Sequence, residues 1–235
     1  MSNVNLDPAE IDKFQALASR WWDRESEFKP LHDINPLRVD YIDQFCDGLK
    51  GKKVLDIGCG GGILTEAMCQ RGAEVTGIDM GEKSLSVARL HLHESKLDID
   101  YQMITAEDYA EIHENEFDIV TCLEMLEHVP VPESIVNACA KLVKPQGKVF
   151  FSTINRNPKS FLFAIVGAEY VLNLLPRGTH EYQRFIKPSE LSSGVRQAGM
   201  EVMDITGMTY NPITKIYKLG RDLDVNYLMA CNAHA

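Results

Sequence analysis

The stretch Val54-Leu55-Asp56-Ile57-Gly58-Cys59-Gly60-Gly61-Gly62 decides the fold class of this chain. Its first four residues predict a short buried strand, and the glycines that follow let the backbone turn sharply and approach a ligand closely. A helix predicted to begin near Ile63 would point its N-terminal amides at that ligand. Glu74–Asp79 predicts a second strand, which ends in a carboxylate 21 residues after Gly58. Because that spacing suits a carboxylate that binds both hydroxyls of a ribose, we expect a cofactor that carries one.

The spacing of the glycines separates two classes of cofactor. A dinucleotide site requires G-x-G-x-x-G or G-x-G-x-x-A, whereas the sixth position counted from Gly58 is Ile63. An NAD-dependent oxidoreductase is therefore nearly excluded. With Asp56 two residues before Gly58 and further glycines at 60, 61 and 62, the loop resembles the first motif of the class I S-adenosylmethionine (SAM) methyltransferases. That resemblance implies a loop that accommodates an amino-acid carboxylate and a ribose rather than two phosphates.

Composition predicts one soluble domain. A chain of 235 residues, 45% of them hydrophobic, can bury one sizeable α/β core, so we expect a single domain over residues 1–235. The formal net charge of −10 offers no broad basic surface for phosphate backbones, which disfavours nucleic acid and favours a small or lipidic substrate. No C-x-x-C pair occurs among the six cysteines and no signal peptide opens the chain, so we expect reduced thiols and a cytoplasmic protein.

Strand and helix signals alternate through the first two thirds of the chain. Asp7-Pro8-Ala9-Glu10 predicts a helix start within an N-terminal helical cap over residues 1–50, with Ile11, Phe14, Leu17, Trp21 and Trp22 on the helix. After the second strand the pattern predicts a helix at 82–95, strands at 100–105 and 117–123, a helix at 132–143 and a strand at 148–154. Such alternation indicates an α/β fold with a doubly wound, mostly parallel sheet that binds ligands at the carboxyl ends of its strands.

Residues 156–187 interrupt this alternation as an apolar, helical insertion after the fifth strand. Only Glu169 and Asn173 are strongly polar between Ser160 and Pro176. A helix over Phe161–Leu175 would be about 22 Å long, which is too short to cross a bilayer. Three interpretations remain: a helix packed on the core, a peripheral membrane contact, or an apolar lid over the substrate.

Further segments resemble one family over nearly the whole length, the bacterial ubiquinone-biosynthesis O-methyltransferases. The tryptophan pair, the Asn-Pro-Leu-Arg segment and the insertion are its more specific features, whereas the glycine motif and Glu127-His128 specify only the superfamily. The chain departs from the family at Pro145-Gln146-Gly147, where Pro-Gly-Gly is usual, and we expect a type I turn there. The matching segments are Ala18–Asp23, Glu27–His32, Ile34–Arg38, Glu124–Val129, Phe151–Asn157, Gly178–His180 and Tyr210–Thr214.

The resemblance implies a function and a set of cofactor contacts. SAM would be the cofactor, and the substrates would be ring hydroxyls of polyprenylated phenols or quinols. A protein acting on such substrates is expected at the cytoplasmic side of the inner membrane, with peripheral contact through Phe161–Leu175, and membership of a biosynthetic complex stays open. A methyltransferase for another small acceptor and a non-catalytic SAM-binding scaffold at the membrane are the alternatives. The implied SAM contacts are Arg38, Gly58, Asp79 and Leu123, and Gly60 of the same loop is included with them.

Methyl transfer to a phenol oxygen requires an acceptor made more nucleophilic, because an unperturbed phenol has a pKa of about 10. The segment after the fourth predicted strand offers Glu124, Glu127 and His128. Three interpretations stay open for it. The three side chains could bind a divalent cation such as Mg²⁺ that stabilises a phenolate, they could have a structural role, or His128 could act as the general base. Glu107, after the third strand, is either near the adenine or on a solvated turn.

Overall fold

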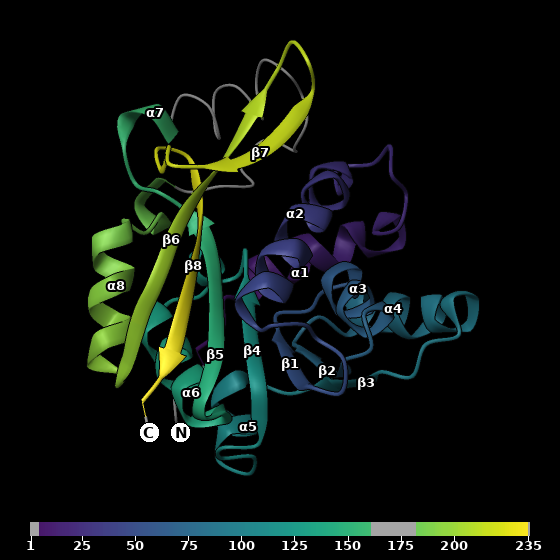
Figure 1. Cartoon of the computed structure of the whole chain (residues 1–235). Helices are drawn as coiled ribbons and strands as arrows, with labels where there is room; N and C mark the ends of the chain where they lie inside the picture. Colours follow the sequence, from purple (N-terminus) through teal and green to yellow (C-terminus); the bar gives the residue numbers. More distant parts are fainter. Residues whose placement is uncertain (1–4, 161–181, 235) are drawn as a thin grey trace.

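A computed structural model describes residues 5–160 and 182–234. Within these residues the strands form one sheet of eight in the order β3-β2-β1-β4-β5-β8-β6-β7 (Figure 1). Neighbours from β3 to β5 are parallel, whereas β8 pairs antiparallel with both β5 and β6, and β7 pairs antiparallel with β6. The strands are β1 Lys53–Ile57, β2 Glu74–Asp79, β3 Asp100–Met103, β4 Phe117–Leu123, β5 Val143–Ile154, β6 Met200–Asn211, β7 Ile216–Gly220 and β8 Asn226–Ala233.

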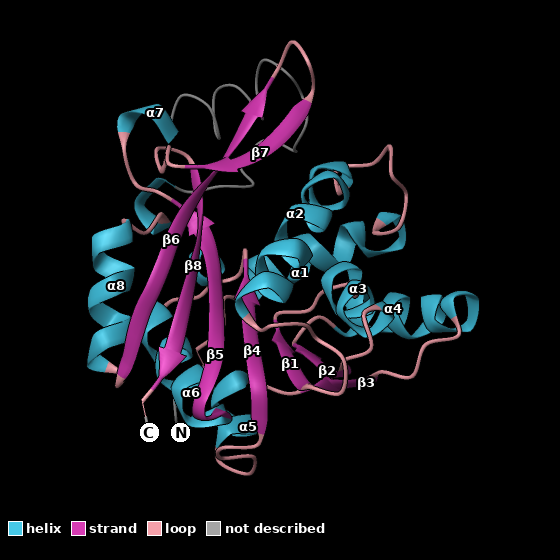
Figure 2. Cartoon of the chain, viewed as in Figure 1, coloured by secondary structure: helices cyan, strands magenta, loops and turns pink. Residues whose placement is uncertain are grey.

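The chain runs outward from β1 to β3 and then returns to β4 on the other side of β1. The reversal opens a crevice at the carboxyl ends of β1 and β4, which is where doubly wound sheets bind their ligands. The predicted fold class is therefore confirmed (Figure 2). The helices are α1 Pro8–Leu17, α2 Lys29–Phe45, α3 Ile63–Gln70, α4 Glu82–Ser95, α5 Ala106–Ala110, α6 Pro132–Leu142, α7 Pro158–Ser160 and α8 Pro188–Gln197, with short 3-10 helices η1 Ala18–Arg20, η2 Leu126–His128 and η4 Tyr182–Arg184.

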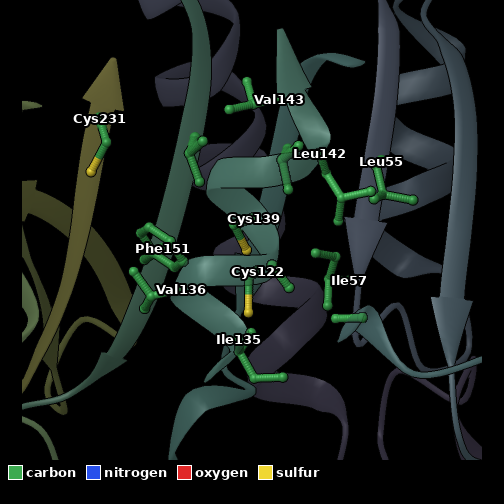
Figure 3. Close-up of a cluster of buried hydrophobic side chains, with 14 of the residues drawn as sticks. Leu55, Ile57, Cys122, Ile135, Val136, Cys139, Leu142, Val143, Phe151 and Cys231 are labelled. Carbon is green, nitrogen blue, oxygen red and sulfur yellow. The ribbon is translucent and has the colours of Figure 1, made fainter. Parts of the chain in front are cut away.

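The side chains of successive strand residues point to opposite faces of the sheet. Leu55 and Ile57 pack with α5, α6 and α8, where Phe151, Cys122 and Cys139 are fully buried (Figure 3). Val54 packs on the other face, with α2 and α3. Both faces are covered, which is why the central strands are apolar almost throughout. The six cysteines are free, as expected.

The N-terminal helix begins as predicted but ends early. Asp7 caps α1, and its side chain accepts a hydrogen bond from the amide of Ala9. The helix stops at Leu17, so Trp21 and Trp22 lie beyond it, after η1. The tryptophans therefore do not continue the apolar face of the helix, and their contacts lie elsewhere.

The predicted type I turn at Pro145-Gln146-Gly147 is wrong. Gln146 has a φ of 64°, whereas a type I turn needs a negative φ at that position. A positive φ at the third turn residue belongs to type II turns, which favour glycine there. This explains why Pro-Gly-Gly suits the position better than the sequence found here. The turn is built into the first part of β5, which begins at Val143 rather than at the predicted Lys148.

Gln146→Gly is therefore expected to stabilise the protein. A left-handed conformation costs an L-residue roughly 1–2 kcal/mol, while glycine adds roughly 0.5–1 kcal/mol of entropy cost on folding. The net gain should be about 0.5–1 kcal/mol, or a rise in melting temperature of about 1–4 °C. As the matched control, Gln197→Gly at the end of α8 replaces a glutamine with negative φ and should lower the melting temperature. A melting temperature that falls in both variants contradicts the account of the turn.

The C-terminal third contains a feature that the sequence did not predict, a hairpin formed by β6 and β7. Figure 2 shows the hairpin extending past the other strands. The predicted helix over Phe161–Leu175 lies outside the described residues. Within the described ranges, no helix is both long enough and apolar enough to cross a membrane.

Candidate active site

The glycine loop follows β1 and leads into α3, as predicted. Gly58, Gly60 and Gly62 have φ values of 71°, 54° and 87°, a region that side chains disfavour. The amides of Gly58 and Cys59 donate to the carbonyl of Ile78, at 2.9 and 3.1 Å, so the loop is tied to the end of β2. The positive φ values and these hydrogen bonds fix the path of the loop backbone between β1 and α3.

Trp21 and Trp22 join the N-terminal helical cap to this loop through packing and a hydrogen bond. A Cβ on Gly60 or Gly61 would lie 2.2 or 2.3 Å from ring atoms of Trp21, so the bare backbone is needed for this packing. The indole Nε1 of Trp22 donates to the carbonyl of Gly61 at 2.9 Å. Sequence reasoning missed this role of the glycines. The available signal was the pair of adjacent tryptophans at the end of the predicted helix.

Asp79 ends β2 and is already positioned by the loop. Its Oδ2 accepts from the amide of Gly60 at 2.9 Å, and its Oδ1 accepts from the amide of Gly81 at 2.6 Å. Burial raises the pKa of this carboxyl against the effect of those two amides. Each carboxylate oxygen can accept a further hydrogen bond. The geometry therefore fits a carboxylate that binds ribose hydroxyls.

Arg38 is a buried guanidinium on α2, only 4% exposed. Its Nη2 donates to the side chain of Asn35 at 3.1 Å, while its Nε is buried and has no hydrogen-bond partner among the described residues. Burial lowers its pKa, and the nearby charges of Glu124 and Asp56 oppose that effect. A buried cation with an unused donor suits an anionic group, because charge-assisted pairing with a carboxylate offsets its desolvation.

One cavity of about 870 Å³ brings the predicted cofactor contacts together. They come from α2, the glycine loop, and the ends of β2 and β4. Residues of α1, of η2 and of the β6–β7 hairpin line the same cavity. The volume lies at the upper end of the range for ligand sites, about 300–1,000 Å³, so the cavity has room for a second ligand beside the cofactor. The cofactor contacts that line it are Arg38, Gly58, Gly60, Asp79 and Leu123.

Asp56 lies at the floor of the loop and was not assigned a role from the sequence. Its two carboxylate oxygens accept hydrogen bonds from the hydroxyls of Thr65 and Thr121, both at 2.7 Å. Burial raises its pKa to about 6 in spite of those bonds. The bonds join β1 to α3 and β4, so Asp56 supports the loop from beneath.

The three candidate metal ligands do not converge. Glu124 Oε1 accepts from the Ser152 hydroxyl at 2.7 Å, and Glu127 Oε2 accepts from the Thr153 hydroxyl at 2.8 Å. His128 instead lies 2.6 Å from Glu10 of α1, measured from its Nδ1 to the carboxylate Oε2. In the part of the chain that the structure describes, no group of three or more His, Cys, Asp or Glu residues is placed to hold a metal ion. The arrangement of these side chains does not support a divalent-cation site shared by Glu124, Glu127 and His128.

Glu10 was missed because it is 118 residues away from His128. Burial alone would raise its pKa, but hydrogen bonds with His128 and Lys13 lower it to about 2. Glu10 is therefore ionised at neutral pH and is placed to accept a hydrogen bond from Nδ1 of His128. Asp7, which caps α1, accepts a hydrogen bond from the guanidinium of Arg184 at 2.6 Å. The carboxylate of Glu107 accepts hydrogen bonds from the side chains of Asn5 and Ser134.

Known proteins with a similar sequence or fold indicate the class of protein to which this chain belongs. A family model described as a methyltransferase domain matches residues 55–151. Magnesium protoporphyrin IX methyltransferase from Synechocystis, solved with bound SAH, has a TM-score of 0.68 at 19% identity and covers 96% of this chain and 95% of its own. A SAM-dependent methyltransferase from Thermotoga maritima also scores 0.68, at 15% identity, covering 95% and 98%. The fold and the cofactor loop thus define a SAM-dependent methyltransferase.

Curated relatives place the chain more narrowly. Ubiquinone biosynthesis O-methyltransferases from Azoarcus and Stutzerimonas stutzeri are 67% and 69% identical to it. The first alignment covers 97% of both chains, and the second covers 96% of this chain and 97% of the relative. The enzyme of the same name from Pseudomonas aeruginosa strain LESB58 is 67% identical over 98% of this chain and 99% of its own. The chain belongs to the ubiquinone biosynthesis O-methyltransferase family.

Proposed function

We propose that the protein methylates ring hydroxyls of polyprenylated phenols or quinols during ubiquinone synthesis. The observation that carries the proposal is the cavity of about 870 Å³, which is lined both by the cofactor contacts and by Glu124, Glu127 and His128, and which extends beyond them. An acceptor bound in the remaining volume would lie beside the cofactor. Such placement supplies most of what this reaction needs, because the reacting atoms must be held close together and in line.

The chain's own residues account for binding and orientation. SAM supplies a methyl group that is already activated on a sulfonium. Asp79 would hold the ribose, and Arg38 would pair with the carboxylate of the methionyl part. Gly58 and Gly60 allow close approach of the backbone, and Leu123, at the end of β4, lines the wall. The cap formed by α1 and Trp21 lines the same cavity, so it excludes water from the bound cofactor.

His128 is the proposed general base, and Glu10 is the residue that positions it. Under this proposal, His128→Ala lowers turnover by about 10²- to 10⁴-fold at neutral pH. Turnover then recovers partly as the pH rises toward the pKa of the phenol, about 10. Glu10→Gln should lower kcat more than it raises KM, since it alters the orientation of the imidazole rather than the binding of substrate.

Chelation separates this proposal from the divalent-cation alternative. If His128 is the base, exhaustive chelation leaves turnover unchanged. If Glu124, Glu127 and His128 instead bind a cation such as Mg²⁺, chelation abolishes turnover, added Mg²⁺ restores it, and the affinity for SAM changes little. Turnover that survives both chelation and His128→Ala in folded protein would assign the cluster a structural role.

Turnover of labelled SAM tests the substrate class. The assay compares a catechol carrying a short prenyl chain with the same catechol lacking it. We expect both to be methylated, with the prenylated acceptor giving the higher kcat/KM because apolar burial contributes about 0.8 kcal/mol per CH₂ group. Equal values would favour an acceptor of another kind. No turnover with either catechol, in protein that binds SAM, would favour a non-catalytic SAM-binding scaffold.

We further propose that the protein contacts the cytoplasmic face of the inner membrane through Phe161–Leu175. The sequence supports this because the segment is apolar and Arg177, Arg184 and Lys187 follow it, whereas the net charge of −10 opposes adsorption to anionic lipid. Liposome flotation should therefore recover the protein with neutral vesicles, and replacing Leu162 and Ile165 by serine should release it. Unchanged flotation of that folded variant would contradict the assignment.

Co-purification from gently solubilised membranes tests the proposed biosynthetic complex.

A further inference from the structure

The β6–β7 hairpin provides a wall of the cavity that the cofactor does not account for. Thr209, Tyr210, Pro212 and Tyr217 of this hairpin line the same cavity as the glycine loop. Tyr210 and Tyr217 are directly opposite each other across the two strands. Their ring centroids are 4.6 Å apart, with the planes tilted by 36°. The hairpin thus presents two adjacent aromatic rings to the cavity.

The topology places these rings on the other side of β4 from Asp79 and the glycine loop. Asp79 ends β2 and the glycine loop follows β1, so the ribose and the loop lie on one side of β4 in the sheet. The hairpin belongs to the opposite end of the sheet order, beyond β5 and β8. The part of the cavity next to the hairpin is also lined by Leu31 and Ile34 of α2, since β7 contacts α2. This part is left for the second ligand.

The two tyrosines are neither core residues nor surface residues. Both are half-buried, whereas Ile213 at the tip of the same hairpin is 91% exposed and does not line the cavity. Burial raises the pKa of Tyr217 to about 12, so its phenol stays neutral throughout the physiological range. Half-buried aromatic rings on a cavity wall suit a flat aromatic ligand, because offset stacking adds to apolar burial.

We propose that Tyr210 and Tyr217 form the subsite that binds the aromatic ring of the acceptor. This inference rests on the proposed function and names the ring, rather than the prenyl tail, as the group bound there. The hairpin is then the element that selects the acceptor, while the loop and Asp79 bind the cofactor. A pair that only stabilised the hairpin would affect folding but not the KM of the acceptor.

Kinetics of leucine and phenylalanine variants test the subsite. Tyr210→Leu and Tyr217→Leu should each raise the KM of the acceptor about 3- to 10-fold, as expected for the loss of one aromatic contact. The dissociation constant of SAM should not change. Tyr210→Phe and Tyr217→Phe retain the ring and should keep the wild-type KM. Ile213→Ser, in the same hairpin but outside the cavity, is the matched control, and its melting temperature and KM should equal those of the wild type.

Two acceptors separate the ring from the tail. The KM should rise by the same factor for the prenylated and the unprenylated catechol. A rise confined to the prenylated catechol would assign the hairpin to the tail, and an unchanged KM in folded leucine variants would overturn the subsite altogether. A parallel loss of SAM affinity would also overturn it. If the wild type methylates neither catechol, the proposed function fails, and titration of unprenylated catechol into SAM-loaded wild type and leucine variants still decides whether the rings bind an aromatic ligand.

Discussion

Replacing Asp79 by alanine is expected to weaken SAM binding by about one to two orders of magnitude. A hydrogen bond to a charged group contributes about 1.5–3 kcal/mol, and at least one such bond to the ribose is lost. The structure adds a second effect, because the carboxylate of Asp79 also accepts hydrogen bonds from the amides of Gly60 and Gly81. Their loss loosens the loop itself. We therefore expect a lower melting temperature as well, and not only a change in affinity.

Calorimetric titration with SAM measures the effect directly. Glu74→Ala is the matched control, since Glu74 begins the same strand and is exposed. That variant should bind SAM as the wild type does. Asp79→Asn should fall between the two, because an amide keeps one acceptor oxygen but loses the charge. Wild-type affinity in folded Asp79→Ala would remove Asp79 from the cofactor site.

Gly61→Ala is expected to disrupt both stability and SAM binding, through contact with Trp21 rather than through the backbone. Gly61 does not have a positive φ, so alanine suits its backbone, but the new Cβ would lie 2.3 Å from the indole. Trp21 is buried and stacked on Phe28, with ring centroids 4.1 Å apart, so it has little room to move. Overpacking of this kind costs about 1–3 kcal/mol. The cap should therefore shift away from the loop and the cofactor affinity should fall with it.

A double-mutant cycle isolates that contact. Trp21→Leu alone should destabilise the cap, but Gly61→Ala should cost little more in that background, because the clashing ring is gone. Gly194→Ala is the matched control, since no atom lies within 4 Å of its added Cβ, and alanine in α8 should stabilise by roughly 0.5–1 kcal/mol. Additive effects of Gly61→Ala and Trp21→Leu on the free energy of unfolding would contradict the proposed contact.

Features that depend on neighbouring residues could be predicted from the sequence. The bounds of β2, β4 and α4 agree with the pattern, since apolar runs and helix starts are local. The glycine loop and Asp79 were found for the same reason, because their spacing follows from one strand, one turn and one helix. The capping by Asp7 also depends on adjacent residues alone.

Features that depend on contacts between distant residues could not be predicted. Trp22 and Gly61 are 39 residues apart, and Glu10 and His128 are 118 apart. Glu124, Glu127 and His128 are close in sequence, yet their side chains have different partners. Glu124 has a φ of 53° and the other two lie in η2, so the backbone directs each side chain to another neighbour. Nearness in sequence was therefore a poor guide to a shared ligand.

The central claim is that the protein transfers the methyl group of SAM to a ring oxygen of the acceptor. Following the methyl carbon tests this claim most directly. SAM labelled with ¹³C in its methyl group is incubated with the enzyme and a prenylated catechol, and the product is examined by NMR and mass spectrometry. The account predicts one labelled methyl per turnover, bonded to a ring oxygen, with formation that slows in Asp79→Ala when SAM is below saturation. Label on a ring carbon, or no transfer at saturating SAM by protein shown to bind both ligands, would contradict the account.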